Sequence, residues 1–394
     1  MFAQSYAFSL KKRNFEENIK VNKHINILSF NVPYPANYGG AIDVYYKLKA
    51  LHDAGVEIIL HTYLYGSAEA PELEKICKEV HYYPRRRGMK SQLSIRPYIV
   101  NSRTEKRLLD NLLLNPYPIL FEGIHLCHYL DHPLLKERTK MVRMANVEHH
   151  YYYHLFKAEL NLKNRLYYLI EALRLKLYQP ILKNAQVIYG ISTTETAYFA
   201  RRFKSQTVEH LPCFHPNTLV NTKEGRGKYI LYHANLSVAE NEQAARWLIK
   251  HIFARLDFPA VIAGKSPSPR LRKLVDRYPH ISLKANVKEQ EMDELIHNAQ
   301  LHTLVTFQPT GLKLKLLNTL YQGRFCVANP QMTEGSGLDS LCVTTASPDE
   351  FLAACHRLLN QPFTANLIEE RRAALSCYYN NHESAKIITK QLKA

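Results

Sequence analysis

Short apolar runs of strand character alternate with amphipathic stretches of helical period twice along this chain, on either side of a polar segment. The first series begins with INILSF at 25–30, and the second begins with YILYH at 229–233. The segment between them, 212–228, contains two prolines and two glycines and has the composition of a linker. Two consecutive strand–helix series with short connections predict an α/β protein with two doubly wound parallel sheets, and they exclude a single barrel.

The length of 394 residues also favours two domains, because a single hydrophobic core rarely grows that large. The composition shifts along the chain set the predicted boundaries. We expect an extension at 1–23, an N-terminal domain at 24–212, a linker at 213–228, a C-terminal domain at 229–375 and a final helical segment at 376–394.

The formal net charge of +17 favours an anionic partner, which can be nucleic acid, an acidic membrane surface or a phosphorylated ligand. A nucleic-acid-binding protein is the weaker alternative, because the chain has no zinc-ligand spacing, RNP-like aromatic motif or concentrated basic tail. Seven cysteines without a C-x-x-C pair are typical of reduced thiols in the cytoplasm, and they predict no metal site. No apolar run approaches the ~18 residues that span a bilayer, so we expect a cytoplasmic protein that is peripheral to a membrane at most.

One strand–turn–helix–strand unit, 301–328, predicts a binding site for an anion. An apolar strand ends at a turn-forming cluster that includes Gln308, Thr310 and Gly311, and an amphipathic helix follows directly. The first turn of such a helix has unpaired backbone N–H groups and a positive dipole, which favour a phosphate. Lys313 and Lys315 lie in that turn, where the dipole disfavours a cation unless an anion is bound; the alternative is that both are solvated.

The first strand also leads through a glycine-containing loop into a helix. Gly39 and Gly40 end the loop NVPYPANYGG, and the helix is expected from 41 to about 54. Backbone amides at this point could bind a phosphate, whereas the alternative is a tight turn that needs glycine for its conformation.

A basic segment at 83–103 has six arginines and lysines among apolar residues. This mixture suggests contact with an anionic membrane surface, and the alternative is a solvated loop beside a packed strand. The residues of this expected surface are Arg85, Arg86, Arg87, Lys90 and Arg96.

Polar residues follow the predicted strand at 140–145, where open α/β sheets bind their ligands. They include Glu148 and His149, and helical periodicity then covers 151–184. The apolar residues that share one face of this helical stretch are Leu166, Leu169, Ile170, Leu173 and Leu177. Further on, Ser192 and Glu195 have the spacing of a capping box that opens another helix.

Several of these segments resemble GT-B glycosyltransferases, close to the family-four (retaining) group. NVPYPANYGGAIDVYYKLKALHDAGVEIILHTY is similar to the opening of such enzymes, and ANVEHHYYYHL is similar to a pattern of one bacterial branch. YILYHANLSVAENEQAARWL, VIAGKSPSPRL and TGLKLKLLNTLYQGRFCVAN resemble successive segments of the C-terminal domain of that branch. The resemblance runs from about residue 25 to the C-terminus.

This resemblance implies two Rossmann-like domains that face each other across a cleft, the C-terminal one binding a nucleotide-sugar and the N-terminal one the acceptor. The final helix would cross back to the N-terminal domain. Glu148, His149 and Glu122 are candidates for acceptor activation or sugar contacts, although each has a structural alternative. The implied donor-binding residues are Gly39, Gly40, Asn235, Lys265, Gln308, Thr310, Gly311, Lys313 and Asn318.

The chain departs from the family pattern at Ala145, where the branch commonly has His, at Asn318, where wider relatives have Glu, and at Ala234, where Gly is usual. The resemblance as a whole implies a retaining, metal-independent hexosyltransferase without a cofactor that builds a bacterial surface glycan on a lipid-linked or protein-linked acceptor. The alternatives are a GT-B sugar-nucleotide epimerase and a catalytically inactive sugar-nucleotide-binding subunit.

Overall fold

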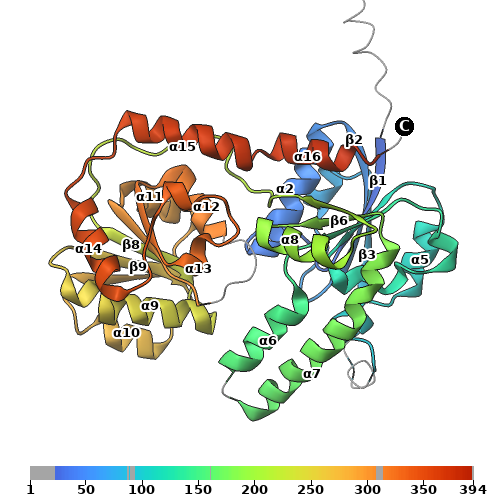
Figure 1. Cartoon of the computed structure of the whole chain (residues 1–394), viewed down its shortest axis with the longest axis horizontal. Helices are drawn as coiled ribbons and strands as arrows, with labels where there is room; N and C mark the ends of the chain where they lie inside the picture. The colour runs from blue at the N-terminus through green and yellow to red at the C-terminus, as the bar shows by residue number, and fades with distance from the viewer. Residues whose placement is uncertain (1–22, 87, 89–93, 160, 308–313, 393–394) are drawn as a thin grey trace, which may run out of the picture. The chain divides into compact units, whose positions relative to one another are not determined.

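The computed structural model describes residues 23–86, 88, 94–159, 161–307 and 314–392, and these residues form two parallel sheets flanked by helices (Figure 1). By contacts the chain divides into two compact units. One contains the chain up to Arg143 with Gln179–Val187 and the segment from Asn381, and the other contains Met144–Tyr178 and Ile188–Asn380. The predicted α/β class with two doubly wound sheets is confirmed. The predicted domain boundaries stay a prediction.

The first sheet has seven strands in the order β3-β2-β1-β4-β5-β6-β7. Chain order reverses on either side of β1, which is the topology of a doubly wound sheet with helices on both faces. The pairs from β3 to β5 are all parallel. The strands are β1 Lys23–Ser29, β2 Val56–Leu64, β3 Glu79–Pro84, β4 Ile119–Glu122, β5 Lys140–Met144, β6 Val187–Gly190 and β7 Thr207–His210.

Helices connect these strands, and their starts follow the sequence signals. Ser192 accepts a hydrogen bond from the Glu195 backbone N–H at 3.3 Å, which confirms the predicted cap of α8. The α-helices are α2 Gly39–Asp53, α4 Tyr98–Asn101, α5 Lys106–Leu112, α6 Glu148–Ala158, α7 Leu162–Tyr178 and α8 Thr193–Arg202. Short 3₁₀ helices lie at η1 Pro71–Lys75, η2 Ile124–Tyr129, η3 Pro133–Leu135 and η4 Gln179–Asn184.

The predicted helical stretch at 151–184 is interrupted. The helices α6 and α7 lie side by side as a hairpin, and η4 replaces the expected last turns (Figure 1). The apolar face expected on this stretch exists on α7, but Leu166, Ile170, Leu173 and Leu177 are exposed. Helical period shows which residues share a face, and it does not show whether another element covers that face.

The second sheet has six strands in the order β10-β9-β8-β11-β12-β13, with every pair parallel. Its strands are β8 Ile230–Asn235, β9 Ala260–Lys265, β10 Ile281–Ala285, β11 Leu301–Leu304, β12 Phe325–Ala328 and β13 Val343–Thr344. Its helices are α9 Ala239–His251, η5 Phe253–Arg255, α10 Pro269–Val275, α11 Glu289–Asn298, α12 Leu314–Gln322, α13 Pro330–Thr333, η6 Asp339–Leu341, α14 Pro348–Leu359 and α15 Ala365–Tyr378.

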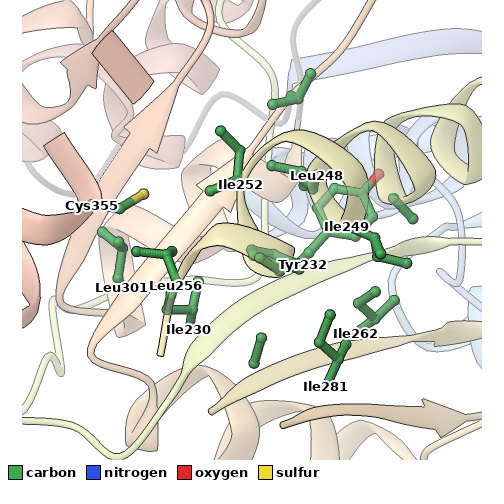
Figure 2. Close-up of a cluster of buried hydrophobic side chains, with 14 of the residues drawn as sticks. Ile230, Tyr232, Leu248, Ile249, Ile252, Leu256, Ile262, Ile281, Leu301 and Cys355 are labelled. Atoms are coloured by element: carbon green, nitrogen blue, oxygen red, sulfur yellow. The ribbon is translucent and has the colours of Figure 1, made fainter. Parts of the chain in front are cut away.

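Alternate residues of the buried strands face opposite sides of this sheet, as the two-residue period of a strand requires. Ile230 and Tyr232 pack beneath α9 with Leu248 and Ile249, and Figure 2 shows this cluster. Leu231, between them in sequence, belongs to a separate cluster with Ile296 of α11. Figure 1 accordingly shows α9 and α10 on one face and α11 and α12 on the other. Both faces are therefore covered, and ligands reach this sheet at its strand ends.

The last helix, α16 Asn381–Thr389, packs against α2. The Lys23 side-chain amine in β1 donates a hydrogen bond of 3.1 Å to the backbone carbonyl of Thr389. The first strand and the last helix thus belong to one compact unit. Among the helices that the structure describes, none combines the length and the apolar character needed to cross a bilayer.

Candidate active site

The candidate donor site begins at the carboxyl ends of β8 and β9 in the second sheet. Asn235 and Lys265 are the last partners of the ladder between these strands, so the structure brings two predicted donor residues together. One position earlier, Ala234 pairs with Gly264. A Cβ at Gly264 would collide with the carbonyl oxygen of Ala234, so the backbones approach more closely here than any larger residue allows.

Two loops that follow the strands support this edge. The Ser266 backbone N–H donates to the side-chain oxygen of Asn286 at 2.8 Å, and the Asn286 N–H donates to the Gly264 carbonyl at 2.9 Å. Both residues have positive φ, 51° at Ser266 and 56° at Asn286. Such angles are uncommon for residues other than glycine and recur at ligand-binding loops. These hydrogen bonds hold the backbone of Gly264 and Ser266, the two neighbours of Lys265 in sequence.

The start of α9 is tied to the loop that follows β11. The Glu240 carboxylate accepts hydrogen bonds from the Thr306 hydroxyl and from the Phe307 backbone N–H, the latter at 3.2 Å. The Asn329 side chain accepts from the Thr306 N–H at 3.1 Å and donates to the Thr306 carbonyl at 2.6 Å. The segment after β11 is therefore fixed from two sides up to Phe307.

Lys315 in the first turn of α12 lies near the same strands. Its amine donates to the Asn241 side-chain oxygen at 3.3 Å and lies 5.5 Å from the centre of the Tyr232 ring. Burial, with a smaller contribution from the Lys315 charge, lowers the pKa of His233 to about 4. His233 is therefore neutral at physiological pH, and Lys315 places a positive charge near it.

Other predicted donor residues lie outside the described part of the chain or have protein partners. Gln308, Thr310, Gly311 and Lys313 lie outside the described residues. Asn318 is described, and its side-chain oxygen accepts a hydrogen bond of 2.9 Å from Asn217. This contact joins α12 to the segment before β8. It uses the side-chain oxygen of Asn318, and the side-chain NH₂ group of Asn318 can act as a hydrogen-bond donor.

Cavity volume alone does not locate the site. A cavity of about 680 Å³ lies between α9 and α10 and is lined by basic side chains, away from the strand ends. A smaller one of about 300 Å³ adjoins the residues that follow β11, β12 and β13, with Trp247, Phe307 and Asn329 in its lining. Only the smaller cavity lies at the edge where open α/β sheets bind ligands.

The first sheet also presents candidate residues beyond a strand end. Glu148 begins α6 just after β5, and its carboxylate is buried. The pKa of Glu148 is raised to about 7, mainly by burial and in part by the charge of Glu195, against the lowering effect of a hydrogen bond from Asn146. A carboxyl group that titrates near neutrality can act as a general acid or base. Burial lowers the pKa of the neighbouring His149 to about 4, so this imidazole is neutral.

Glu122 is the partner of a buried lysine. The Lys47 amine lies 2.6 Å from a Glu122 carboxylate oxygen and 3.6 Å from Asp43, and Arg143 contacts the same Asp43. All four side chains are buried, and the two carboxylates balance the two cations. This arrangement places Glu122 in an ionic cluster at the end of β4, whereas the contacts of Glu148 are with Asn146 and Glu195.

Gly39 and Gly40 form the first turn of α2, so the helix begins two residues earlier than expected. No side chain caps this helix, and no acidic residue lies in its first turn. A Cβ at Gly40 would press on the Phe30 ring, which explains the glycine without invoking a turn of positive φ. The uncapped N-terminus retains the electrostatic preference for an anion.

The arginines of the basic segment have protein partners. The Arg85 side chain donates to the Ser102 hydroxyl at 3.1 Å and lies 4.1 Å from the centre of the Tyr65 ring. Arg86 faces Glu105 at 4.0 Å, and Arg96 lies 2.8 Å from a His128 ring nitrogen. Arg87 and Lys90 lie outside the described residues.

We call the carboxyl ends of β8 and β9, with the loops that support them, the donor edge. The sequence predictions missed four residues that shape it: Glu240, Ser266, Asn286 and Asn329. Asn286 carried one signal, because asparagine tolerates positive φ better than most residues and here it follows a short strand. The others make contacts with residues 20 or more positions away, and no local pattern predicts such pairs.

The second sheet lies within the part of the chain that matches a known family. Residues 227–361, which contain β8 to β13, match the family model "Glycosyl transferases group 1". A Klebsiella pneumoniae protein described as an uncharacterized 44.6 kDa protein in the cps region is 26% identical over 389 residues. The alignment covers 94% of this chain and 99% of that protein.

Solved structures share the fold at low sequence identity. The Candida albicans trehalose-6-phosphate phosphatase N-terminal domain is 11% identical with a TM-score of 0.63, over 95% of this chain and 97% of that one. The α,α-trehalose 6-phosphate synthase of Burkholderia multivorans is 10% identical with a TM-score of 0.60, over 94% and 98%. An E. coli structure described as trehalose-6-phosphate bound with UDP-2-fluoro glucose is 10% identical with a TM-score of 0.60, over 94% and 99%.

The family match supports the coarser prediction of a glycosyltransferase, and the structural likeness confirms the predicted fold. Residues 227–361 of this chain match the glycosyl transferases group 1 model, and the chain shares the GT-B fold of the solved structures named above.

Proposed function

We propose that this protein transfers a hexosyl group from a nucleotide-sugar to a glycan acceptor during synthesis of a bacterial surface polysaccharide. The observation that carries the proposal is the donor edge of β8 and β9. There Gly264 permits close backbone approach, and Asn235 and Lys265 end the two strands within the matched range. The cps region of the Klebsiella pneumoniae relative supports a polysaccharide product.

Lys265 is our candidate for the donor diphosphate. The departing nucleoside diphosphate gains negative charge in the transition state, and a fixed cation stabilises that charge. Lys265 is exposed, but its backbone is held by the ladder to β8 and by the braced residues Ser266 and Asn286. A metal ion is not required by this scheme. Within the described ranges, no three His, Cys, Asp or Glu side chains come together as metal ligands.

Glu148 is our candidate for acid–base chemistry or for a contact with the sugar. Its pKa of about 7 allows it to exchange a proton at physiological pH. In its protonated form it can donate a hydrogen bond to a sugar hydroxyl, and in its ionised form it can accept one. The resemblance to retaining enzymes leads us to propose that the anomeric configuration of the donor is kept in the product.

We propose a lipid-linked or protein-linked glycan as the acceptor, with the enzyme on the cytoplasmic face of the membrane. A thermal-shift screen of nucleoside diphosphates and nucleotide-sugars tests the donor assignment, since a ligand that binds only the native state raises its stability. One nucleotide series should raise the midpoint of wild type and raise that of Lys265→Ala much less. If no nucleotide raises the midpoint of wild type, the proposed function is wrong.

A further inference from the structure

The helix α7 carries a row of exposed apolar side chains. Leucine and isoleucine side chains of this size are usually buried, and a contiguous exposed patch of them marks an interaction site. The row is defined by Leu162, Leu166, Ile170, Leu173 and Leu177, whose exposed fractions are 78%, 58%, 39%, 55% and 79%.

The row occupies one narrow side of the helix. Successive residues turn by about 100° around an α-helix, so the five side chains lie within an arc of about 80°. Ala172 and Leu175, on the opposite side, are buried, and the Tyr168 ring contacts Tyr152 of α6 at 6.1 Å between centres. The hairpin therefore buries one face of α7 and leaves the apolar row of α7 facing outward.

The charges that border the row all have one sign. Lys163 and Arg174 lie on one side of it and Arg165 and Lys176 on the other, each within about 60° of the row's edge by the same helical turn. The acidic residue of α7, Glu171, is buried and accepts a hydrogen bond of 2.9 Å from Arg174. The exposed surface of α7 is therefore apolar along its middle and basic along both margins.

From these contacts we propose that α7 docks the protein on an anionic lipid bilayer, with the apolar row of α7 inserted between headgroups and the basic margins at the phosphates. Helices with one apolar side and a lysine- and arginine-rich border lie in the membrane interface in this way. Docking of a second copy on the same row would bring like charges face to face along both margins, which disfavours that occupant. The inference does not depend on the donor site, because α7 contributes no residue to it.

The basic segment at 83–103 is less suited to this role. Arg85, Arg86 and Arg96 contact side chains of the protein, so neutralising lipid phosphates would compete with those contacts. On α7, Lys163 and Lys176 are exposed on the two margins beside the apolar row, while Arg174 pairs with Glu171 and Arg165 lies over the Phe156 ring.

Flotation of the full chain with lipid vesicles tests the proposal. We expect wild type to bind phosphatidylcholine vesicles that contain phosphatidylglycerol, and to bind pure phosphatidylcholine vesicles at least about tenfold less. Binding should weaken when salt rises from about 0.1 M to about 1 M, because the Debye length falls from about 10 Å to about 3 Å.

Two variants separate the apolar and the electrostatic contributions. The triple change Leu166→Ser, Leu173→Ser and Leu177→Ser should lower binding to anionic vesicles at least about tenfold. The double change Lys163→Glu and Lys176→Glu should lower it by a similar factor through charge alone. The matched control is Leu114→Ser with Leu219→Ser, which removes leucines with 77% and 79% exposure from other surfaces and should bind like wild type.

Folding and self-association are measured on the same samples. The thermal midpoint and the nucleoside diphosphate affinity of each variant should equal those of wild type, so failure of vesicle binding is distinct from failure of the donor site. Equal vesicle binding by the triple variant, or no binding by wild type at low salt, overturns the proposal. Light scattering gives the oligomeric state. If wild type forms a dimer and does not bind vesicles, and the triple variant is a monomer, the apolar row binds a second copy. That result also overturns the proposal.

Discussion

Asn235 and Lys265 are adjacent at the carboxyl edge of the second sheet, where the ladder between β8 and β9 ends. Parallel strands align their carboxyl ends, so residues 30 positions apart in sequence meet at one place. One step earlier in the ladder, Gly264 lies so close to the Ala234 carbonyl and the Leu236 side chain that no Cβ fits there. The donor assignment depends on this geometry.

Lys265→Ala should weaken nucleoside diphosphate binding by at least about tenfold, or roughly 1.4 kcal/mol. The reason is that the lysine neutralises a phosphate, while its removal from an exposed position leaves the fold intact. Calorimetric titration with the nucleotide found in the screen measures the effect. The exposed lysine of α9, Lys250→Ala, serves as the control. Equal affinity of Lys265→Ala and wild type would remove Lys265 from the site.

Gly264→Ala should lower both stability and donor affinity. The added methyl group meets the Ala234 carbonyl, so β8 and β9 must move apart, at about 1–3 kcal/mol for overpacking of this kind. Urea unfolding and nucleotide titration measure the two effects. Gly88→Ala is the matched control, because a Cβ there has no neighbour within 4 Å and no positive φ is involved. If Gly264→Ala is as stable as Gly88→Ala, the close approach is not a constraint.

Glu148→Gln should change how stability depends on pH. The pKa of Glu148 is raised to about 7 in the folded protein from its ordinary value of 4.5, so the native state holds the proton more tightly. The contribution of Glu148 to the free energy of unfolding is complete below about pH 4.5 and is lost as pH rises through about 7.

The variant lacks this loss, so its stability relative to wild type should increase between pH 5 and pH 8, by roughly 2–3 kcal/mol. Urea midpoints at both pH values provide the measurement, with the exposed Glu334→Gln as control. A pH-independent difference between Glu148→Gln and wild type would show that this carboxyl group titrates normally.

Lys47→Met should destabilise the protein by about 3–5 kcal/mol, because it leaves the buried Glu122 carboxylate without its lysine partner, while Asp43 keeps Arg143. Adding Glu122→Gln should recover part of the loss, since one uncompensated charge is then removed. A double-mutant cycle in urea measures this coupling. If the effects of the two changes are additive, the 2.6 Å contact between Lys47 and Glu122 does not couple these residues energetically. Glu122 would then again be a candidate for acceptor activation or sugar contacts.

The sequence was sufficient for the sheets and for the strand ends, because buried parallel strands and their covering helices have strong periodic patterns. It also predicted the Ser192 cap, a local signal within four residues. It could not predict the bracing of Ser266 by Asn286 or of Thr306 by Glu240, since these pairs are 20 and 66 positions apart and depend on loop geometry.

The leucines of α7 show a second limit of sequence reasoning. Their spacing correctly places Leu166, Ile170, Leu173 and Leu177 on one face, but the same spacing serves a buried helix and an exposed amphipathic one. Only the packing of α7 on α6 shows which face is covered. For the basic segment at 83–103, the sequence suggested a membrane-surface contact or a solvated loop, and it could not show that Arg85 and Arg96 contact protein side chains.

The most direct test of the account is a reaction followed by NMR, with the purified protein, the nucleotide-sugar found in the screen and a lipid-linked glycan acceptor extracted from cells. We predict release of nucleoside diphosphate together with a new glycosidic bond that keeps the anomeric configuration of the donor, and no donor consumption without acceptor. Formation of a free sugar or an epimer without acceptor would contradict the account in favour of an epimerase. Saturable donor binding with no consumption under any condition would contradict it in favour of an inactive binding subunit.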